Sequence, residues 1–221
     1  MASIAIRSTL SLPNKADIVS RLASSPPLGE LLTADDLERQ HEIGTRALKP
    51  AAVLLLVVNH AADPTVVFTQ RTAHLADHAG QISFPGGRCD EGDCTPERTA
   101  LREAEEEVGI SSDRVEILGR LPEYRTSTGY SVTPVVGWAE PPLEFSPDPH
   151  EVADIFEVPL AFLLDPGNHR YESAFHKGRM RRYWAMPYGE RFIWGATAGM
   201  LVTFHRILIP RPIARAGLHG S

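Results

Sequence analysis

Three glutamates near the middle of the chain are spaced so that they could bind a metal ion. Glu103, Glu106 and Glu107 stand at positions i, i+3 and i+4 of a predicted helix, which brings their carboxylates to one face within about 5–6 Å. Like charges at this spacing repel, and no lysine stands four residues further on to compensate them. A solvated acidic helix face is one explanation. The other is a site for a hard divalent cation, Mg²⁺ or Mn²⁺, because such ions prefer oxygen ligands.

A glycine pair and an arginine beside this cluster favour the cation site. Gly86 and Gly87 lie in a glycine-rich stretch upstream of the helix, where backbone N–H groups can approach an anionic ligand that a Cβ would obstruct. A Gly-Gly turn is weak evidence when taken alone. Arg102 stands inside the acidic cluster, where its guanidinium can pair with carboxylates. Together these residues predict a site that binds a metal ion and an anionic ligand.

A well-delimited helix must position the glutamates. Thr95 and Pro96 are a capping residue and a first helical residue, and Gly109 is a C-cap, so the sequence predicts a helix ending at about Val108. Upstream, residues 51–58 form a short, unbroken Val/Leu-rich run that is typical of a strand buried on both faces. Residues 65–69 predict a second strand that forms a hairpin with the first, and residues 80–92 predict a loop.

The rest of the chain predicts one layered domain of mixed α/β class. Further strands are predicted at 115–121, 132–138 and 153–158, and a hairpin at 171–174 and 182–185. Residues 14–44 have the pattern of a helical lead-in with a break at Pro26-Pro27, and residues 192–208 that of a closing helix.

Composition excludes several functional classes. The chain has 221 residues, a formal charge of -6 and a sequence pI near 5.8, with no long basic run, which argues against non-specific binding to nucleic acid or to an anionic membrane. The longest apolar run is residues 51–58, far below the roughly 20 residues of a membrane-spanning helix. Two cysteines indicate free thiols in a reducing compartment. We therefore expect a cytoplasmic protein whose partner is a small molecule.

The loop and helix together resemble the Nudix box, G-x5-E-x7-R-E-U-x-E-E-x-G-U with U apolar. Gly87 matches the leading glycine, and Asp93 stands where the box has its first acid. Eight residues rather than seven separate Asp93 from Arg102, an addition that falls before the helix cap. The remaining box positions are filled by Arg102, Glu103, Ala104, Glu106, Glu107, Gly109 and Ile110.

A second resemblance points to the coenzyme A pyrophosphatase branch of the Nudix hydrolases. Residues 67–72, Gly80 and residues 84–87 are similar to the signature L-L-T-x-R-[SA]-x3-R-x3-G-x3-F-P-G-G. Residues 128–137 and 194–198 also look like that branch, so the likeness extends over about residues 47–208. One departure concerns substrate recognition, because Ala76 stands where the signature has an arginine.

The resemblance implies a Nudix-type α/β/α sandwich with a mixed sheet. With the pattern along the chain it gives three expected segments: an N-terminal helical lead-in (1–46), a hydrolase domain (47–208) and a flexible tail (209–221). It implies hydrolysis of coenzyme A or acyl-CoA to 3',5'-ADP and 4'-(acyl)phosphopantetheine. The alternatives are a Nudix pyrophosphatase for ADP-ribose, NADH or another nucleoside diphosphate derivative, and a non-catalytic Nudix-fold ligand sensor. The oligomeric state stays open, with a homodimer as one candidate.

The resemblance also assigns roles to individual residues. It makes Glu103, Glu106 and Glu107 the ligands of Mg²⁺ or Mn²⁺, with Arg102 orienting the carboxylates. The general base is left open between a box glutamate such as Glu103 and Glu151, which precedes a predicted strand; an exposed turn residue is the other interpretation of Glu151. Residues expected to contact substrate are Arg71, Gly86, Gly87 and the loop histidine His78.

Overall fold

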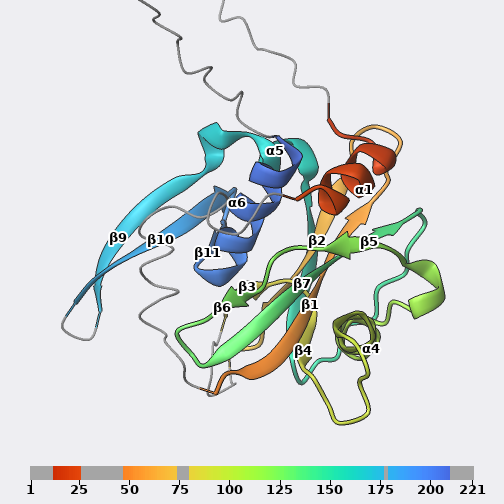
Figure 1. Ribbon diagram of the computed structural model, residues 1–221, viewed down its shortest axis with the longest axis horizontal. Helices are drawn as coiled ribbons and strands as arrows, with labels where there is room; N and C mark the ends of the chain where they lie inside the picture. Colours follow the sequence, from red (N-terminus) through yellow and green to blue (C-terminus); the bar gives the residue numbers. More distant parts are fainter. Residues whose placement is uncertain (1–11, 26–46, 74–79, 177–178, 210–221) are drawn as a thin grey trace, which may run out of the picture.

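A mixed sheet forms the centre of the molecule, as the computed structural model shows (Figure 1). The structure describes residues 12–25, 47–73, 80–176 and 179–209. Strands β1 (Lys49–Val58) and β7 (Tyr130–Ala139) run parallel along their whole length, whereas the other strand pairs of this sheet within the described residues are antiparallel. The order is β3-β2-β1-β7-β5, with β4, β6 and β8 paired to β1, β7 and β2.

Most of the predicted strands are confirmed. β1 is buried from Ala51 onwards except for the half-buried Val53, and it forms the predicted hairpin with β2 (Thr65–Arg71), in which Val57 faces Val66. The prediction of a loop at residues 80–92 is wrong in part, because this stretch contains two short strands, at 82–83 and 86–88. In the second of them, Gly86 and Gly87 pair with β1. The other strands of this sheet are β3 Ile82–Ser83, β4 Gly86–Arg88, β5 Glu116–Arg120, β6 Tyr124–Arg125 and β8 Val152–Pro159.

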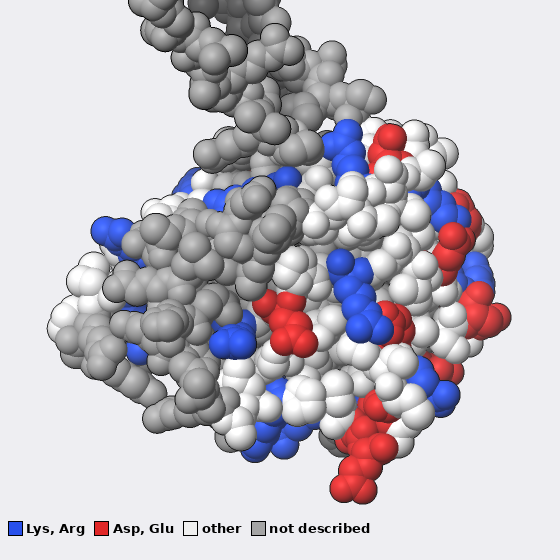
Figure 2. All heavy atoms as spheres, viewed as in Figure 1, with Lys and Arg blue, Asp and Glu red and all other residues white. Residues whose placement is uncertain are grey.

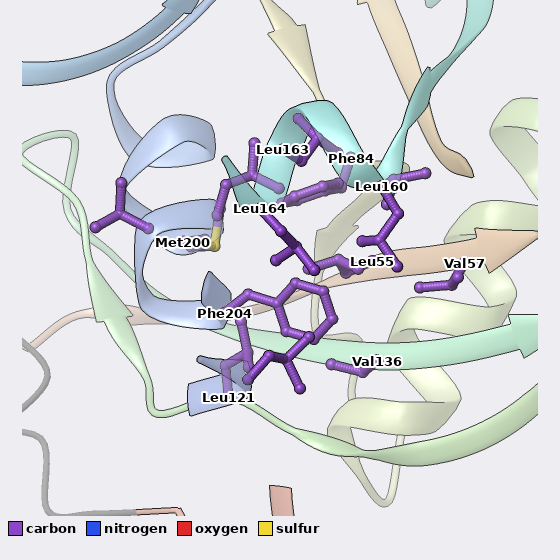
Figure 3. Packing of buried hydrophobic residues seen from close by; sticks show 14 of the residues in the cluster. Leu55, Val57, Phe84, Leu121, Val136, Leu160, Leu163, Leu164, Met200 and Phe204 are labelled. Atoms are coloured by element: carbon purple, nitrogen blue, oxygen red, sulfur yellow. The ribbon is translucent and has the colours of Figure 1, made fainter. Parts of the chain in front are cut away.

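Helices cover both faces of the sheet, which makes the fold an α/β/α sandwich. Helix α4 (Pro96–Val108) packs on one face through Ala100, Ala104 and Val108. The other face is covered by α1 (Lys15–Ala23), α5 (Leu160–Leu164) and α6 (Ala196–Leu208). Figure 3 shows Phe204 and Met200 of α6 among side chains of the sheet and of α5, including Leu55 and Leu164. Short 3-10 turns follow α4 and α5 at η1 Ser112–Arg114 and η2 Pro166–Asn168.

A second, three-stranded sheet consists of β9 (Arg170–His176), β10 (Arg179–Tyr188) and β11 (Arg191–Trp194). It joins the core through Met186 and Ile193, while the β9–β10 hairpin extends away from it (Figure 1). The hairpin prediction for β9 and β10 is confirmed. The prediction of a closing helix is wrong at its start, because residues 192–194 belong to β11. Gly195, with φ at 66°, links β11 to α6. A short apolar run has no period that distinguishes strand from helix, and only pairing with β10 decides it.

Part of the predicted helical lead-in is confirmed as α1, whose cap Asn14 accepts from the backbone N–H of Asp17 at 3.0 Å. Residues 26–44 of that prediction, and the positions of His78 and Ala76, lie outside the described residues.

Among the described helices, none has the length and apolar character that a membrane span requires. On the face seen in Figure 2, the described Lys and Arg lie among Asp and Glu rather than in one broad basic surface.

Candidate active site

Helix α4 begins and ends where the sequence predicts. The Thr95 hydroxyl accepts from the backbone N–H of Arg98 at 3.4 Å, Pro96 is the first helical residue, and Gly109 adopts the left-handed conformation with φ at 73°. The N–H of Gly109 donates to the carbonyl of Glu105 at 3.0 Å. This frame fixes the helical phase, so that Ala104 and Val108 face the sheet while the glutamates turn toward the Gly86–Arg88 strand.

Arg102 is the hub of the acidic cluster. Its Nη1 lies 3.0 Å from Glu103 Oε1 and 3.0 Å from Glu106 Oε2. On the other side of the guanidinium, Nη2 donates to Asp93 Oδ2 at 2.8 Å and to the carbonyl of Arg88 at 3.1 Å. Arg102 therefore ties the helix to the preceding loop and holds two of the three box glutamates in place.

Asp93 anchors this arginine, a role that the sequence does not reveal. Its carboxylate accepts from the Thr99 hydroxyl and from the backbone N–H of Asp90, each at 3.0 Å, as well as from Arg102. The Arg102 hydrogen bond holds the pKa of Asp93 far below its usual range. The box pattern places an acid here, but only the turn that folds Asp93 back over the helix start identifies its partner.

Glu107 is the most deeply buried of the three glutamates, with 7% of its side chain exposed, against 18% for Glu103 and 59% for Glu106. Its Oε2 accepts from the backbone N–H of Gly86 at 3.1 Å. Burial raises the pKa of Glu107 to about 7, with the charges of Glu103 and Glu151 adding to the effect. Burial also raises the pKa of Glu103. The positive charges of Arg102 beside Glu103 and of Arg71 beside Glu107 lower these two pKa values by less than burial raises them.

Both glycines of the pair are required by close neighbours. Gly86 has φ at 150°, and a Cβ there would come within 2.5 Å of the Cα of Val53 on β1. A Cβ on Gly87 would come within 2.5 Å of the Glu103 carboxylate carbon. Gly86 therefore allows the backbone of β4 to approach β1, and Gly87 leaves the space that the Glu103 carboxylate occupies.

Arg71 and Glu151 lie beside Glu107. Arg71 Nη1 is 4.0 Å from Glu107 Oε1 and 3.9 Å from Glu151 Oε2. The structure thus brings together six of the predicted site residues from β2, β4, α4 and the turn before β8, whereas Glu106 joins them only through Arg102. These six are Arg71, Gly86, Gly87, Glu103, Glu107 and Glu151. His78, also a predicted site residue, lies outside the described residues.

The donor set suits a hard divalent cation, because it consists of carboxylates whose charge is poorly compensated. Within the described residues, however, no three His, Cys, Asp or Glu side chains are grouped so that they could hold a metal ion as they stand. Arg102 pairs with Glu103 and Glu106, and the Gly86 N–H holds Glu107. Cation binding would compete with Arg102 for its two glutamates.

The raised pKa of Glu107 predicts a stability that depends on pH. A carboxyl whose folded pKa exceeds its unfolded value stabilises the fold below the unfolded pKa, and this contribution is lost as pH rises through the folded pKa. A rise from 4.5 to about 7 corresponds to about 3 kcal/mol. We expect wild type to be less stable than Glu107→Gln at pH 8 by roughly that amount, and the two to be similar near pH 4. Denaturant unfolding in excess chelator at both pH values measures this; an equal difference at both would contradict it.

Comparison with known proteins identifies the class of this fold and site. The NUDIX domain model matches residues 48–178, more than half of the chain. The chain belongs to the Nudix family. It is a Nudix hydrolase, an enzyme that acts on the pyrophosphate bonds of nucleoside diphosphate derivatives, and hydrolases of this family generally use divalent ions such as Mg²⁺ or Mn²⁺.

Among its relatives is the "Uncharacterized Nudix hydrolase NudL" of Escherichia coli O7:K1, which is 44% identical over 153 residues, 69% of this chain and 79% of the relative. The protein of the same name from Citrobacter koseri is 39% identical over 178 residues, 80% of this chain and 93% of the relative. A solved Nudix hydrolase from M. smegmatis, RenU, is 27% identical, with a TM-score of 0.44, over 50% of this chain and 70% of that one.

Proposed function

We propose that this Nudix hydrolase cleaves the diphosphate of coenzyme A or acyl-CoA to 3',5'-ADP and 4'-(acyl)phosphopantetheine. The observation that carries the proposal is the position of Arg71, the arginine that the branch signature and this sequence share. Its guanidinium lies between Glu107 and Glu151, next to the glycine strand of the same signature. The positive charge of this guanidinium could pair with the diphosphate of a substrate that binds against the acidic helix.

In this proposal Glu103, Glu106 and Glu107 hold the divalent cation. A bound cation would neutralise the diphosphate and activate water for attack on phosphorus. Arg102 orients Glu103 and Glu106 through its two 3.0 Å contacts, and a bound cation would draw these carboxylates away from the guanidinium. Gly86 and Gly87 let the β4 backbone approach the phosphates.

The general base is proposed to be Glu103 or Glu151. Glu103 is largely buried beside Gly87, and its raised pKa favours accepting a proton from water. Glu151 is half exposed, and its carbonyl accepts from the N–H of Thr72 at 3.0 Å, which fixes its backbone at the end of β2.

We also propose three segments for the chain, residues 1–46, 47–208 and 209–221, with the hydrolase domain in the second.

Substrate preference and the site of attack can be tested together. We expect the highest kcat/KM for coenzyme A in a panel with dephospho-coenzyme A, ADP-ribose and NADH, with Mg²⁺ or Mn²⁺ present. In isotopically labelled water, the label should appear in one of the two phosphate products, identified by mass spectrometry, because water attacks phosphorus. A higher kcat/KM for ADP-ribose or NADH would overturn the substrate assignment. Release of unlabelled coenzyme A from acyl-CoA would indicate a thioesterase.

Ala76 is the specific reason to keep ADP-ribose and NADH as the second candidate. The signature arginine absent at this position would make a charge-assisted contact worth roughly 1.5–3 kcal/mol if it read a substrate phosphate. Without that arginine we expect a smaller difference in kcat/KM between coenzyme A and other nucleoside diphosphate derivatives. The Ala76→Arg variant can be run in the same panel, where a selective gain for coenzyme A is expected.

A further inference from the structure

The two strands that end at Arg71 and begin after Glu151 lose their regular pairing just before the site. From Thr65 to Gln70, β2 pairs with β8 residue for residue, and Gln70 lies opposite Asp154. The next residue, Arg71, lies opposite Val152, so β8 carries one extra residue at this point. Such a bulge bends the strand and re-aims the side chains beyond it.

Arg191, on β11 of the second sheet, spans the last regular pair before this bulge. Its Nη1 donates to Gln70 Oε1 at 2.5 Å, and its Nη2 pairs with Asp154 Oδ2. The guanidinium carbon also lies 4.5 Å from the ring centre of Phe156, two residues further along β8. One side chain from a separate sheet therefore holds both strands immediately ahead of the irregularity.

Arg71 has little of its own to hold it in place. Its two carboxylate contacts are long, at 3.9 and 4.0 Å, and its Nε is buried without a hydrogen-bond partner among the described residues. Its backbone N–H donates to the carbonyl of Gln81, and that of Thr72 to the carbonyl of Glu151, each at 3.0 Å. The placement of Arg71 and Glu151 therefore depends on the backbone at the bulge.

We propose that Arg191 is a positioning residue that fixes the β2–β8 bulge, so that Arg71 and Glu151 stand opposite Glu107. This inference rests on the proposed function in so far as Arg71 contacts substrate there. Part-exposed ion pairs contribute little to global stability, and one third of the Arg191 side chain is exposed. Its effect therefore falls on activity rather than on the free energy of unfolding.

A double-mutant cycle with coenzyme A as substrate tests this inference. We expect Arg191→Ala to lower kcat/KM about tenfold, because small displacements of substrate-contacting groups are costly. In an Arg71→Ala background, Arg191→Ala should lower kcat/KM by less than about twofold, since the effects of substituting groups that act through one another are not additive. Arg191→Lys, which keeps the charge beside Asp154 but not the forked contact, should lie between. Arg114→Ala is the matched control, because Arg114 also donates to two acceptors, the carbonyls of Glu140 and Pro142, away from the site.

A second measurement needs no turnover. In the 221-residue chain, the NMR signal of the Arg71 Nε–H should shift in Arg191→Ala and stay unchanged in Arg114→Ala. An unchanged Arg71 signal, or a tenfold loss that persists in the Arg71→Ala background, would overturn the positioning role. If wild type hydrolyses neither coenzyme A nor ADP-ribose, the proposed function fails, while the Arg71 signal still decides the role of Arg191.

Discussion

Glu107→Gln is expected to lower kcat roughly a thousandfold while the protein stays folded, because losing one of the three proposed metal ligands would remove several kcal/mol of electrostatic stabilisation. The amide is nearly isosteric and can still accept from the Gly86 N–H, so local packing is preserved. It also removes a buried charge that is poorly compensated, which should raise the free energy of unfolding above neutral pH. Steady-state kinetics over a series of Mg²⁺ and Mn²⁺ concentrations, with circular dichroism on the same samples, measures both effects.

Glu105→Gln is the matched control for that experiment. Glu105 stands on the same helix and is exposed, and it is not one of the box glutamates. We expect wild-type activity in this variant and loss of activity in Glu106→Gln. Full wild-type turnover in excess chelator, or an unfolded Glu107→Gln, would contradict the assignment of the cluster to metal binding.

Alanine at the two adjacent glycines should give opposite phenotypes. In Gly86→Ala the new Cβ meets the backbone of β1, which cannot yield, and the residue must keep φ at 150°. We expect a loss of roughly 3 kcal/mol or more in the free energy of unfolding. In Gly87→Ala the three atoms nearest the new Cβ all belong to the Glu103 carboxylate, the far end of a flexible side chain. That variant should fold and lose roughly a hundredfold in kcat, because Glu103 is displaced.

Denaturant unfolding and kinetics on both variants separate the two effects. Gly92→Ala is a suitable control, since a Cβ there meets nothing within 4 Å. A stable, fully active Gly87→Ala would show that the position of Glu103 does not matter for turnover. A fully stable Gly86→Ala would show that β4 can move away from β1 without cost.

Much of the local structure follows from the sequence alone. The limits of α4 are set by Thr95, Pro96 and Gly109, whose capping chemistry acts within one helical turn. The buried strand β1 is recognisable because an unbroken Val/Leu run has few other places to lie. Glu103, Glu106 and Glu107 lie within five consecutive positions, so the predicted helix carries all three regardless of the tertiary structure.

Contacts between distant residues were decided only by the tertiary structure. Sequence spacing places Glu106 and Glu107 on the same helix, but only packing buries Glu107 against Gly86 and leaves Glu106 exposed. No local pattern shows that Arg191 reaches Gln70, 121 positions away, because such a contact depends on how two sheets meet. The propensities and caps that a sequence displays act over a few residues, whereas burial, pKa and side-chain pairing depend on which elements pack together.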